Sequence, residues 1–286
     1  MGTLQSNQLE AFFRVAQTKN FTKASEQLHI TQSALSQRIL NLEEELGTTL
    51  FIRDRSGLRL TETANKLVRF CLAKNDLEND FLSTLKASSE YTGIVRIGGF
   101  SSVLRSVVLP ALSSFLNKHM DVQLMILTKE ISELYDLLKT GEVDFILTDH
   151  KYERDEFESI RLGYELNVLV ESKTSKSCDI YLDHDPSDEI TIKYLRKNGI
   201  KDNKIKRRYL DDVYGLIDGV KMGLGRAVLP IHLIKDDKSL RVVNPKMFLQ
   251  TEVYLNFFKQ SYYSKLHQQT LKEITQGASL ILNKKP

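Results

Sequence analysis

Short polar side chains occupy residues 31–38, and arginines follow them. Gln32 can make a bidentate contact with adenine, and Arg38 can hold guanine or a phosphate oxygen. Ser33 and Ser36 can reach base edges or phosphates from the same side of a helix. These residue types and their spacing suit the major groove of double-stranded DNA. The full set of candidate DNA contacts is Thr31, Gln32, Ser33, Ser36, Gln37, Arg38, Arg53 and Arg55.

The elements around this stretch are predicted to form a helix-turn-helix. An amphipathic helix with apolar residues three and four apart is expected at about residues 5–18, and a shorter helix is expected at 22–28, after a turn and cap at 20–22. Thr31 is a candidate N-cap for the next helix, and Gly47 its expected end. The inward side of this last helix is expected to consist of Ala34 or Leu35, then Ile39, Leu42 and Leu46.

A β-hairpin, or wing, is predicted next, from apolar runs at residues 50–52 and 58–60 that flank Arg55-Ser56-Gly57. A polar face in an ordinary helical bundle is the alternative interpretation of residues 31–38. The hairpin favours DNA, because phosphate binding requires local positive charge rather than a basic total. Residues 1–60 hold seven Lys/Arg against six Asp/Glu, so the clustering of arginines carries this prediction.

A long helix is predicted from residue 61 to about 88, with an imperfect apolar stripe that breaks at Lys74 and Asn75. Two partners for the stripe stay open. Either the winged domain folds back on it, or a second copy of the helix packs against it in a homodimer. The stripe consists of Ala64, Leu67, Val68, Cys71, Leu72, Leu77, Phe81 and Leu85.

The pattern changes after residue 93 to alternating strands and helices. The order β-α-β-α-β over residues 94–147 predicts a parallel sheet with covering helices. A second α/β unit follows residue 161, with a last strand at 251–258 and a terminal helix at 262–282. The expected fold class is α/β: an N-terminal winged helix-turn-helix and a long linker helix, then two α/β units.

A small-molecule site is expected where strands end, because ligands of open α/β sheets bind beyond the carboxyl ends of strands. Ser101 and Ser102 follow the first strand and begin a helix, so their hydroxyls and free N–H groups could hold a carboxylate. Helix caps or solvated loop ends are the alternative. The candidate effector contacts are Ser101, Ser102, Thr128, Thr148 and Asp149, and Lys129 also follows a strand.

Length and composition exclude several classes of protein. The 286 residues suggest about two domains, and no apolar run approaches the ~18 residues that a membrane span needs. With no secretory signal visible, a cytoplasmic protein with no membrane partner is expected. The histidines are scattered and no nucleophile elbow is visible, so we expect no cofactor, no metal and no enzymatic activity. An enzyme and a DNA binder without a ligand remain alternatives.

Three further features are expected to be structural. Residues 193–208 are strongly basic, which indicates a solvated face more than an anion or second DNA surface. Residues 183–189 are acidic, but their spacing differs from that of a calcium-binding loop. Cys71 and Cys178 are expected to be inert thiols, and a redox role stays open.

Residues 5–66 resemble the LysR-type transcriptional regulators. The resemblance rests on the strings TQSALSQRI at 31–39, LEEELGTTLFIR at 42–53 and LTE at 60–62. Gln37 and Ala64 depart from the family's usual Arg and Gly, and the second lobe lacks its usual Pro after the strand ending near residue 170. These departures put the base contact at Gln37 and the carry-over of effector contacts in question.

The resemblance implies a DNA-binding domain at 1–60, a linker and dimerisation helix at 61–90, and an effector domain at 91–286. That domain would have two lobes of the periplasmic-binding-protein type, lobe I at about 91–161 and 257–286, and lobe II at about 162–256. The implied partners are double-stranded DNA, a small-molecule effector such as an amino acid or a carboxylate, RNA polymerase, and further copies of the chain in a homodimer or homotetramer.

Overall fold

Helices and a hairpin form the N-terminal unit in a computed structural model that describes residues 4–55, 57–85, 90–175, 179–200 and 205–282. The elements are α1 (Ser6–Thr18), α2 (Phe21–Gln27), α3 (Gln32–Leu46), β1 (Phe51–Asp54) and β2 (Gly57–Leu60). Apolar side chains three and four apart lie on one face of a helix, so they meet in one core. Its buried members include Leu9, Phe12, Val15, Ala16, Ala24, Leu35, Ile39, Leu42 and Leu50.

Local caps fix where these helices begin and end. The Asn20 side chain accepts a hydrogen bond from the α2 backbone at 3.0 Å, and Thr31 Oγ1 accepts one from the Ala34 N–H at 3.2 Å. Gly47 follows α3 at φ +62°, a left-handed conformation that glycine adopts without steric cost. The predicted cap and end of α3 are therefore confirmed. Leu35, and not Ala34, takes the first inward position.

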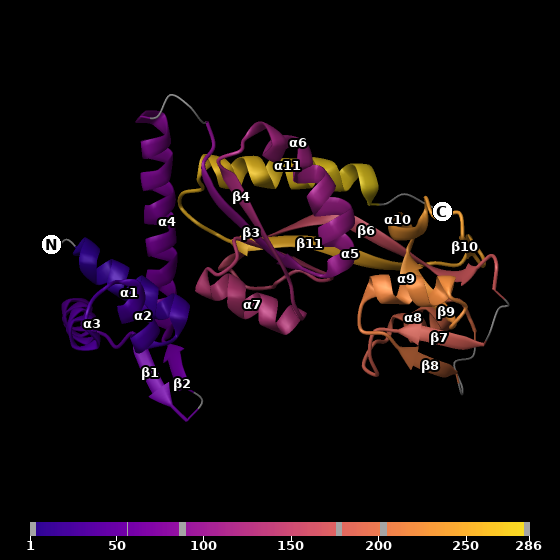
Figure 1. The fold of residues 1–286 in the computed structure, drawn as a ribbon, viewed down its shortest axis with the longest axis horizontal. Helices are drawn as coiled ribbons and strands as arrows, with labels where there is room; N and C mark the ends of the chain where they lie inside the picture. Colours follow the sequence, from indigo (N-terminus) through magenta and orange to yellow (C-terminus); the bar gives the residue numbers. More distant parts are fainter. Residues whose placement is uncertain (1–3, 56, 86–89, 176–178, 201–204, 283–286) are drawn as a thin grey trace.

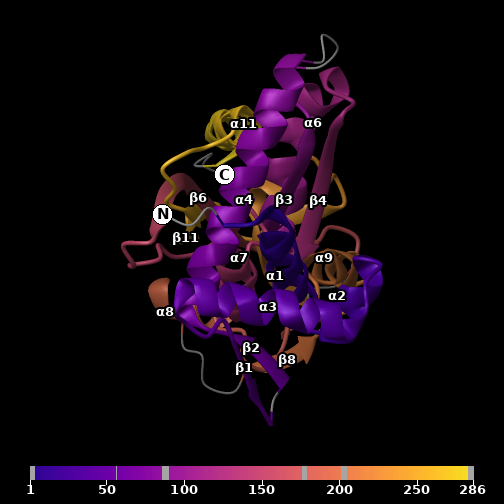
Figure 2. The same ribbon diagram turned by 90° about the vertical axis from the view of Figure 1, so that its left-hand side faces the viewer.

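The long helix α4 (Glu62–Leu85) stands between the N-terminal unit and the rest of the molecule (Figures 1 and 2). Ala64, Val68 and Cys71 of its first turns are buried in the core of the N-terminal unit. The winged unit therefore covers the first half of the predicted stripe. The exposed apolar side chains of α4 are Phe70, Leu77, Phe81 and Leu82.

Lobe I is a parallel sheet with helices on both faces (Figure 1). Its strands, in order across the sheet, are β4 (Val122–Thr128), β3 (Gly93–Gly99) and β5 (Phe145–Thr148). Its helices are α5 (Ser101–Val103), a π-helical segment (Leu104–Val108), α6 (Leu109–Lys118), α7 (Ile131–Thr140) and α11 (Lys265–Ile281). The core beneath α6 and α11 is separate from the one beneath α7, which places the sheet between two helical layers.

Lobe II repeats this arrangement on a smaller scale. Its strands are β7 (Ile180–Asp183), β8 (Lys206–Tyr209), β9 (Arg226–Pro230) and β10 (Leu240–Val242), and its helices are α8 (Ile190–Lys197), α9 (Val213–Lys221) and α10 (Ile231–Ile234). β7 pairs in parallel with β8 and β9, while α9 and α10 pack over one apolar cluster and α8 over another. The sequence analysis did not predict the short elements α10 and β10.

Two long strands, β6 (Phe157–Ser172) and β11 (Leu249–Phe258), run through both lobes and join them into one sheet. They are antiparallel to each other, and β11 is also antiparallel to β5, and β6 to β9. The parallel sheet predicted over residues 94–147 is thus confirmed by β3, β4 and β5, while the long strands add antiparallel pairs that this prediction did not cover. The pairing of β6 with β11 shifts register between Val253 and Tyr254, near the passage from one lobe to the other.

Candidate DNA-binding edge and effector cavity

The helix α3, which carries most of the candidate DNA contacts, lies on the side of the molecule away from lobe II (Figures 1 and 2). Gln32, Ser33 and Gln37 are exposed, and Ser36 and Arg38 are half-buried. The buried leucines and isoleucine of the same helix anchor its opposite face in the core of the N-terminal unit. The helix that the sequence selected for groove contact therefore presents its polar side chains to solvent.

The arginines of the wing differ in how they are held. Arg59 pairs with Asp54 across the hairpin at 3.4 Å. The Arg53 guanidinium lies 4.9 Å from the centre of the Phe21 ring, a cation–π contact that sets it beside the start of α2. Arg53 and Arg55 form no ion pair with any residue that the structure describes, so both charges stay available for phosphate.

Two of the predicted DNA contacts already have partners within the helix. Thr31 Oγ1 caps α3 and lies 3.0 Å from Ser33 Oγ. Gln37 Nε2 donates to Asn41 Oδ1 at 2.8 Å. Asn41 lies one turn further along the exposed edge and is absent from the sequence-based candidates. The (i, i+4) spacing from Gln37 is the signal that could have found it.

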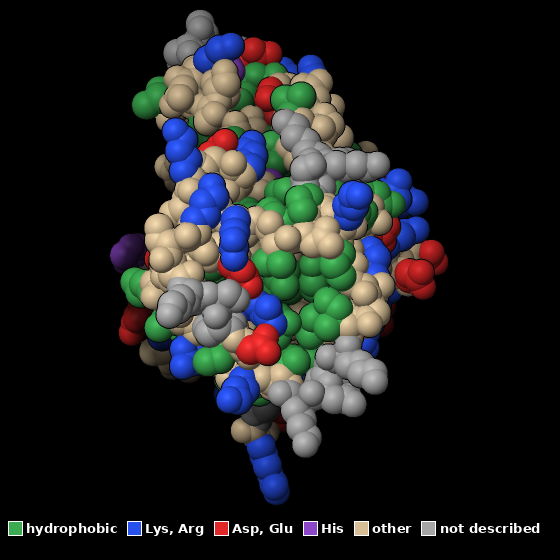
Figure 3. All heavy atoms as spheres, turned by 90° about the vertical axis from the view of Figure 1, so that its right-hand side faces the viewer, with side chains coloured by type: hydrophobic (Ala, Val, Ile, Leu, Met, Phe, Trp, Pro, Cys, Tyr) green, Lys and Arg blue, Asp and Glu red, His purple; other side chains and the backbone are tan. Residues whose placement is uncertain are grey.

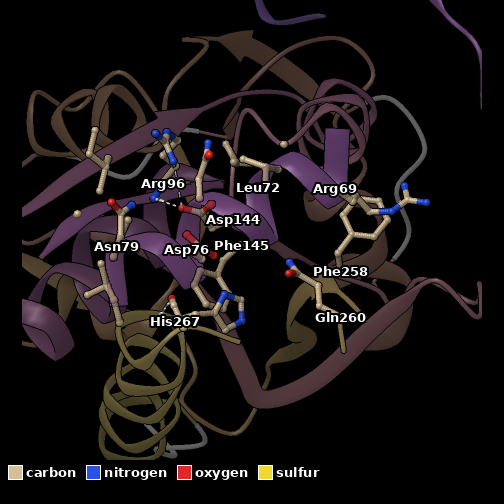
Figure 4. A pocket seen from close by; sticks show the side chains of 18 of the residues that line it. Arg69, Leu72, Asp76, Asn79, Arg96, Asp144, Phe145, Phe258, Gln260 and His267 are labelled. Carbon is tan, nitrogen blue, oxygen red and sulfur yellow. Dashed lines mark hydrogen bonds and ion pairs between the residues drawn. The ribbon is translucent and has the colours of Figure 1, made fainter. Parts of the chain in front are cut away.

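The junction of α4 with lobe I links the N-terminal unit to the effector domain (Figure 4). Tyr262 donates its hydroxyl proton to Asp80 Oδ2 at 2.5 Å, and the Arg69 guanidinium lies 4.5 Å from the centre of the Phe258 ring. Gly141, at φ +71°, packs so closely against Leu72 that a Cβ atom there would come within 2.2 Å of Leu72 Cδ1. Through these contacts lobe I packs directly against the linker helix α4.

Carboxylates face each other in a cavity of about 240 Å³ at this junction. Figure 4 shows Asp76 of α4 next to Asp144 of lobe I. Burial raises the pKa of each to about 6, and the charges of Asp144 and Asp80 add to the effect at Asp76. Asp144 Oδ2 accepts from the Arg96 N–H at 2.7 Å, which opposes the shift. Burial also lowers the pKa of His267, on the cavity wall, to about 4.

A larger cavity, of about 630 Å³, lies between the two lobes. The predicted contacts that line it are Ser101, Ser102, Thr128, Lys129 and Asp149. Thr148 does not reach it. Its side chain is fully buried, donates to the His150 carbonyl at 2.6 Å and accepts from Asn256 Nδ2 at 2.7 Å. Thr148 therefore supports the sheet behind the cavity.

A buried polar network ties the lobes together beside this cavity. Ser102 Oγ of lobe I donates to Glu165 Oε1 at 2.9 Å, and His232 Nε2 of lobe II lies 2.9 Å from the same oxygen. The other ring nitrogen of His232 lies 2.9 Å from Ser106 Oγ. The Ser102–Glu165 and Ser106–His232 contacts cross between the lobes, and the His232–Glu165 contact joins them, so the network resists a relative movement of the lobes.

The lobe II wall holds cavity residues that the sequence analysis missed. Asp211 and Asp212 follow β8 and precede α9. Asp212 Oδ2 accepts from the Tyr214 and Gly215 N–H groups, and its Oδ1 lies 3.3 Å from Ser101 Oγ of lobe I. Their position after a strand end is the same signal that selected Ser101. The same rule, applied to the strands of lobe II, selects Asp211 and Asp212 after β8.

Two residues of the basic stretch, Lys193 and Arg207, form ion pairs with the acidic stretch. Arg207 binds Asp183 at 2.5 Å and also donates to the Asp188 carbonyl, and His184 lies 2.9 Å from Asp188. In the ranges that the structure covers, no group of His, Cys, Asp and Glu is arranged to hold a metal ion. Cys71 is buried, which raises the pKa of its thiol to about 11. Cys178 lies outside the described residues.

A groove of about 480 Å³ lies at the end of lobe II, where charged side chains and His232 surround an apolar lining of Ile231, Ile234, Leu240, Val242, Pro245 and Ile281. Figure 3 shows hydrophobic side chains gathered on this face of the molecule, with Lys and Arg side chains near their border. The groove offers mainly apolar contacts. The interlobe cavity, with its many polar groups, is better suited to orient a polar ligand.

Comparison with known protein families gives two matches that together span most of the chain. Residues 6–65 match the bacterial regulatory helix-turn-helix protein, lysR family, and residues 88–279 match the LysR substrate binding domain. No helix among the described residues has the length and apolar character of a membrane span.

Curated relatives are similar over half or more of the chain. The uncharacterised HTH-type regulator YusT of Bacillus subtilis is 30% identical over 236 residues, 79% of either chain. The transcriptional activator IlvY of Haemophilus influenzae is 36% identical over 149 residues, 50% of either chain.

Solved structures show the same fold. ArgP from Mycobacterium tuberculosis superposes with a TM-score of 0.79 at 21% identity and covers 98% of this chain and 99% of its own. Full-length LysG from Corynebacterium glutamicum with bound effector Arg gives 0.77 at 17% identity, over 98% of this chain and all of its own. Winged helix-turn-helix, linker helix and two-lobed α/β domain follow one another in the order that the resemblance implied. The chain belongs to the LysR family of transcriptional regulators.

Proposed function

We propose that this chain binds specific DNA sequences through α3 and the wing, and that a small molecule in the interlobe cavity controls this binding. The observation that carries the proposal is the polar edge of α3. Gln32, Ser33 and Gln37 on this edge are exposed, and the opposite face of the helix is buried in the core of the N-terminal unit. The helix lies away from lobe II (Figure 2). Side chains of this kind on an exposed helix can reach base edges in a major groove.

The proposed DNA-binding form is a homodimer or homotetramer. Four exposed apolar side chains on α4, Phe70, Leu77, Phe81 and Leu82, follow helical spacing and are each 48–61% exposed. Packing against the same helix of a second copy would remove them from water. A pair of winged units in that arrangement would contact two half-sites of an inverted repeat. We propose that each copy in this assembly has its DNA-binding domain at residues 1–60, its linker and dimerisation helix at 61–90 and its effector domain at 91–286.

The proposed mechanism couples the cavity to DNA through α4. Ligand binding between the lobes shifts the position of lobe I relative to lobe II. Asp80, Arg69 and Leu72 then pass this shift to the linker helix through their contacts with lobe I. The ligand works only if it binds the two states with different affinity. Ser101, Ser102, Thr128 and Asp149 are the proposed contacts, and Thr148 is left out because it is buried behind them.

LysG, which shares the fold, was solved with its effector arginine bound. We therefore propose an effector of the amino acid class for this chain as well. We further propose a cytoplasmic location, contact with RNA polymerase at the promoter, and no catalytic role.

A salt-titrated gel-shift assay on the DNA upstream of the gene tests the proposal. Ser36→Ala combined with Arg53→Ala should weaken binding at least about ten-fold and lower the salt slope by about one for each phosphate that the variant no longer neutralises. Lys118→Ala, which removes an exposed charge from α6, is the matched control and should bind as the wild type does. Wild-type affinity in the double variant, or an affinity indifferent to salt, contradicts the proposal. A chain that binds DNA but no small molecule would be a constitutive DNA binder.

A further inference from the structure

We infer that the interlobe cavity takes an organic cation, a ligand with an ammonium or guanidinium group and a net positive charge. The inference rests on the proposed function, because it assumes that this cavity holds the effector. The cavity between the lobes identifies the site. The charges on its walls then select the class of ligand.

Carboxylates dominate the walls of the cavity. Of the described lining residues, nine are Asp or Glu and one is Lys. They come from both lobes and from the strand between them, so the ligand would be surrounded. A cleft lined by one sign of charge with low-dielectric walls concentrates ions of the opposite sign. The nine are Glu130, Glu133, Asp149, Glu165, Asp183, Asp185, Asp188, Asp211 and Asp212.

Internal pairing removes only part of this negative charge. Some carboxylates have a basic partner within 3.5 Å; these pairs are Glu133–Lys129, Asp149–His150, Glu165–His232, Asp183–Arg207 and Asp188–His184. By contrast, Glu130, Asp185, Asp211 and Asp212 form no ion pair with any residue that the structure describes. Glu130 belongs to lobe I and the three aspartates to lobe II. Unneutralised charge therefore stands on opposite walls.

The expected carboxylate site at the start of α5 is unfavourable for an anion. Ser102 Oγ already donates to Glu165, and Ser101 Oγ lies within hydrogen-bond distance of Asp212. A ligand carboxylate placed here would lie beside two carboxylates of the protein and would compete with them for the same donors. The sequence analysis expected Ser101 and Ser102 to bind a carboxylate of the ligand. The structure instead favours a positively charged group of the ligand at this position.

An organic cation fits this distribution better than a metal ion. A metal needs several oxygens converging on one point at 2.0–2.6 Å. Among the described residues no group of three or more metal-ligating side chains converges in this way. A ligand with several N–H donors can instead bind carboxylates on both walls at once. The volume of about 630 Å³ is also that of a site for a small organic molecule.

Calorimetric titration of the full-length chain tests the inference. The cations are L-arginine, agmatine and putrescine; L-citrulline serves as the neutral isostere of arginine and L-glutamate as an anion. At least one cation should bind about ten-fold or more tightly than citrulline and glutamate. Its affinity should fall when NaCl is raised from 0.05 to about 0.5 M, because salt screens the attraction.

A charge-neutral variant locates the effect. Asp211 has φ +60°, a conformation that asparagine also tolerates, so Asp211→Asn should fold normally. Combined with Glu130→Gln, it should weaken cation binding about ten-fold or more. Asp236→Asn removes an exposed carboxylate outside the cavity and should leave the affinity unchanged.

Three results would overturn the inference. These are citrulline or glutamate binding as tightly as the cations, wild-type cation affinity in the double variant, and no cation binding at all. A gel shift on the same preparation separates this failure from that of the proposed function. If DNA binding persists, the regulator stands and only the ligand class is wrong. If DNA binding is also absent at low salt, the proposed function itself fails.

Discussion

The edge of α3 and the interlobe cavity are built in opposite ways. On α3 the polar side chains follow one another along a single helix and are mostly exposed. In the cavity they come from strand ends far apart in the chain, as with Ser101 and Asp212, which lie 111 positions apart. Many of the cavity residues are also held by hydrogen bonds to one another. One surface is thus set by local sequence and the other by how the sheet brings distant segments together.

The two regions also carry opposite charge. In the wing, Arg53 and Arg55 have no carboxylate partner among the described residues, while the cavity holds carboxylates without cationic partners there. The net charge of +3 for the whole chain hides both. The net charge of the chain therefore does not indicate what either region binds. The charges near each region do, because the electrostatic field at a bound ligand comes mainly from the nearest charged groups.

The largest effect is expected from the buried face of α3. Leu42→Ala should lower the free energy of unfolding by about 2–5 kcal/mol, because it leaves a cavity in the core of the N-terminal unit. Leu40 lies on the same helix with 50% of its surface exposed, so Leu40→Ala is the matched control and should cost less than about 1 kcal/mol. Urea denaturation measures both. Equal losses in the two variants would contradict the packing that holds the DNA-binding edge.

A smaller effect separates a cap from a contact on the same edge. Thr31→Ala should lower stability by about 1 kcal/mol, because the Ala34 N–H loses its acceptor. Gln32→Ala should change stability by less than about 0.5 kcal/mol but weaken specific DNA binding by about 1–3 kcal/mol. Thermal unfolding and gel shifts of both variants measure the two effects. The assignment of Gln32 fails if its alanine variant still discriminates the specific site from random DNA.

Local signals account for what the sequence predicted correctly. Caps such as Thr31 and Gly47, and the spacing of Leu35, Ile39 and Leu42, depend only on neighbours within one helix. The sixteen residues of β6 and the antiparallel pairing of β6 with β11 depend on segments far apart in the chain. β6 continues from one lobe into the other without interruption, so no turn or loop within it marks where one lobe ends.

The same limit applies to the cavity. Strand ends selected Ser101, Ser102, Thr128 and Asp149, and all four line it. Thr148 is one residue from Asp149, yet it is the last residue of β5, and its side chain is buried in hydrogen bonds with the His150 carbonyl and Asn256. Local rules therefore find the edge of a sheet where a ligand can bind. Which lobe II residues meet that edge is decided by the pairing of distant strands.

The smallest effect is expected at the junction between the two regions, where Asp76 of α4 lies next to Asp144 of lobe I. Both pKa values are raised to about 6, whereas an unfolded chain has Asp pKa values near 3.9. The native state therefore binds protons more tightly. These two carboxyls should therefore contribute more stability as the pH falls from 7 through 6 toward about 4, whereas His267, whose pKa burial lowers to about 4, contributes less as the pH falls below about 6.5.

Asp76→Asn removes one of the facing charges while keeping the shape of the side chain. It should raise the free energy of unfolding at pH 7 by less than about 1 kcal/mol, and this gain over the wild type should shrink as the pH falls from 7 to 5. Thermal unfolding across that range measures the change, with the exposed carboxylate change Glu45→Gln on α3 as control. A variant less stable than the wild type at pH 7 would show that the Asp76 charge favours docking of α4 on lobe I. The two regions would then be coupled by attraction across the junction instead of by contacts that overcome a repulsion.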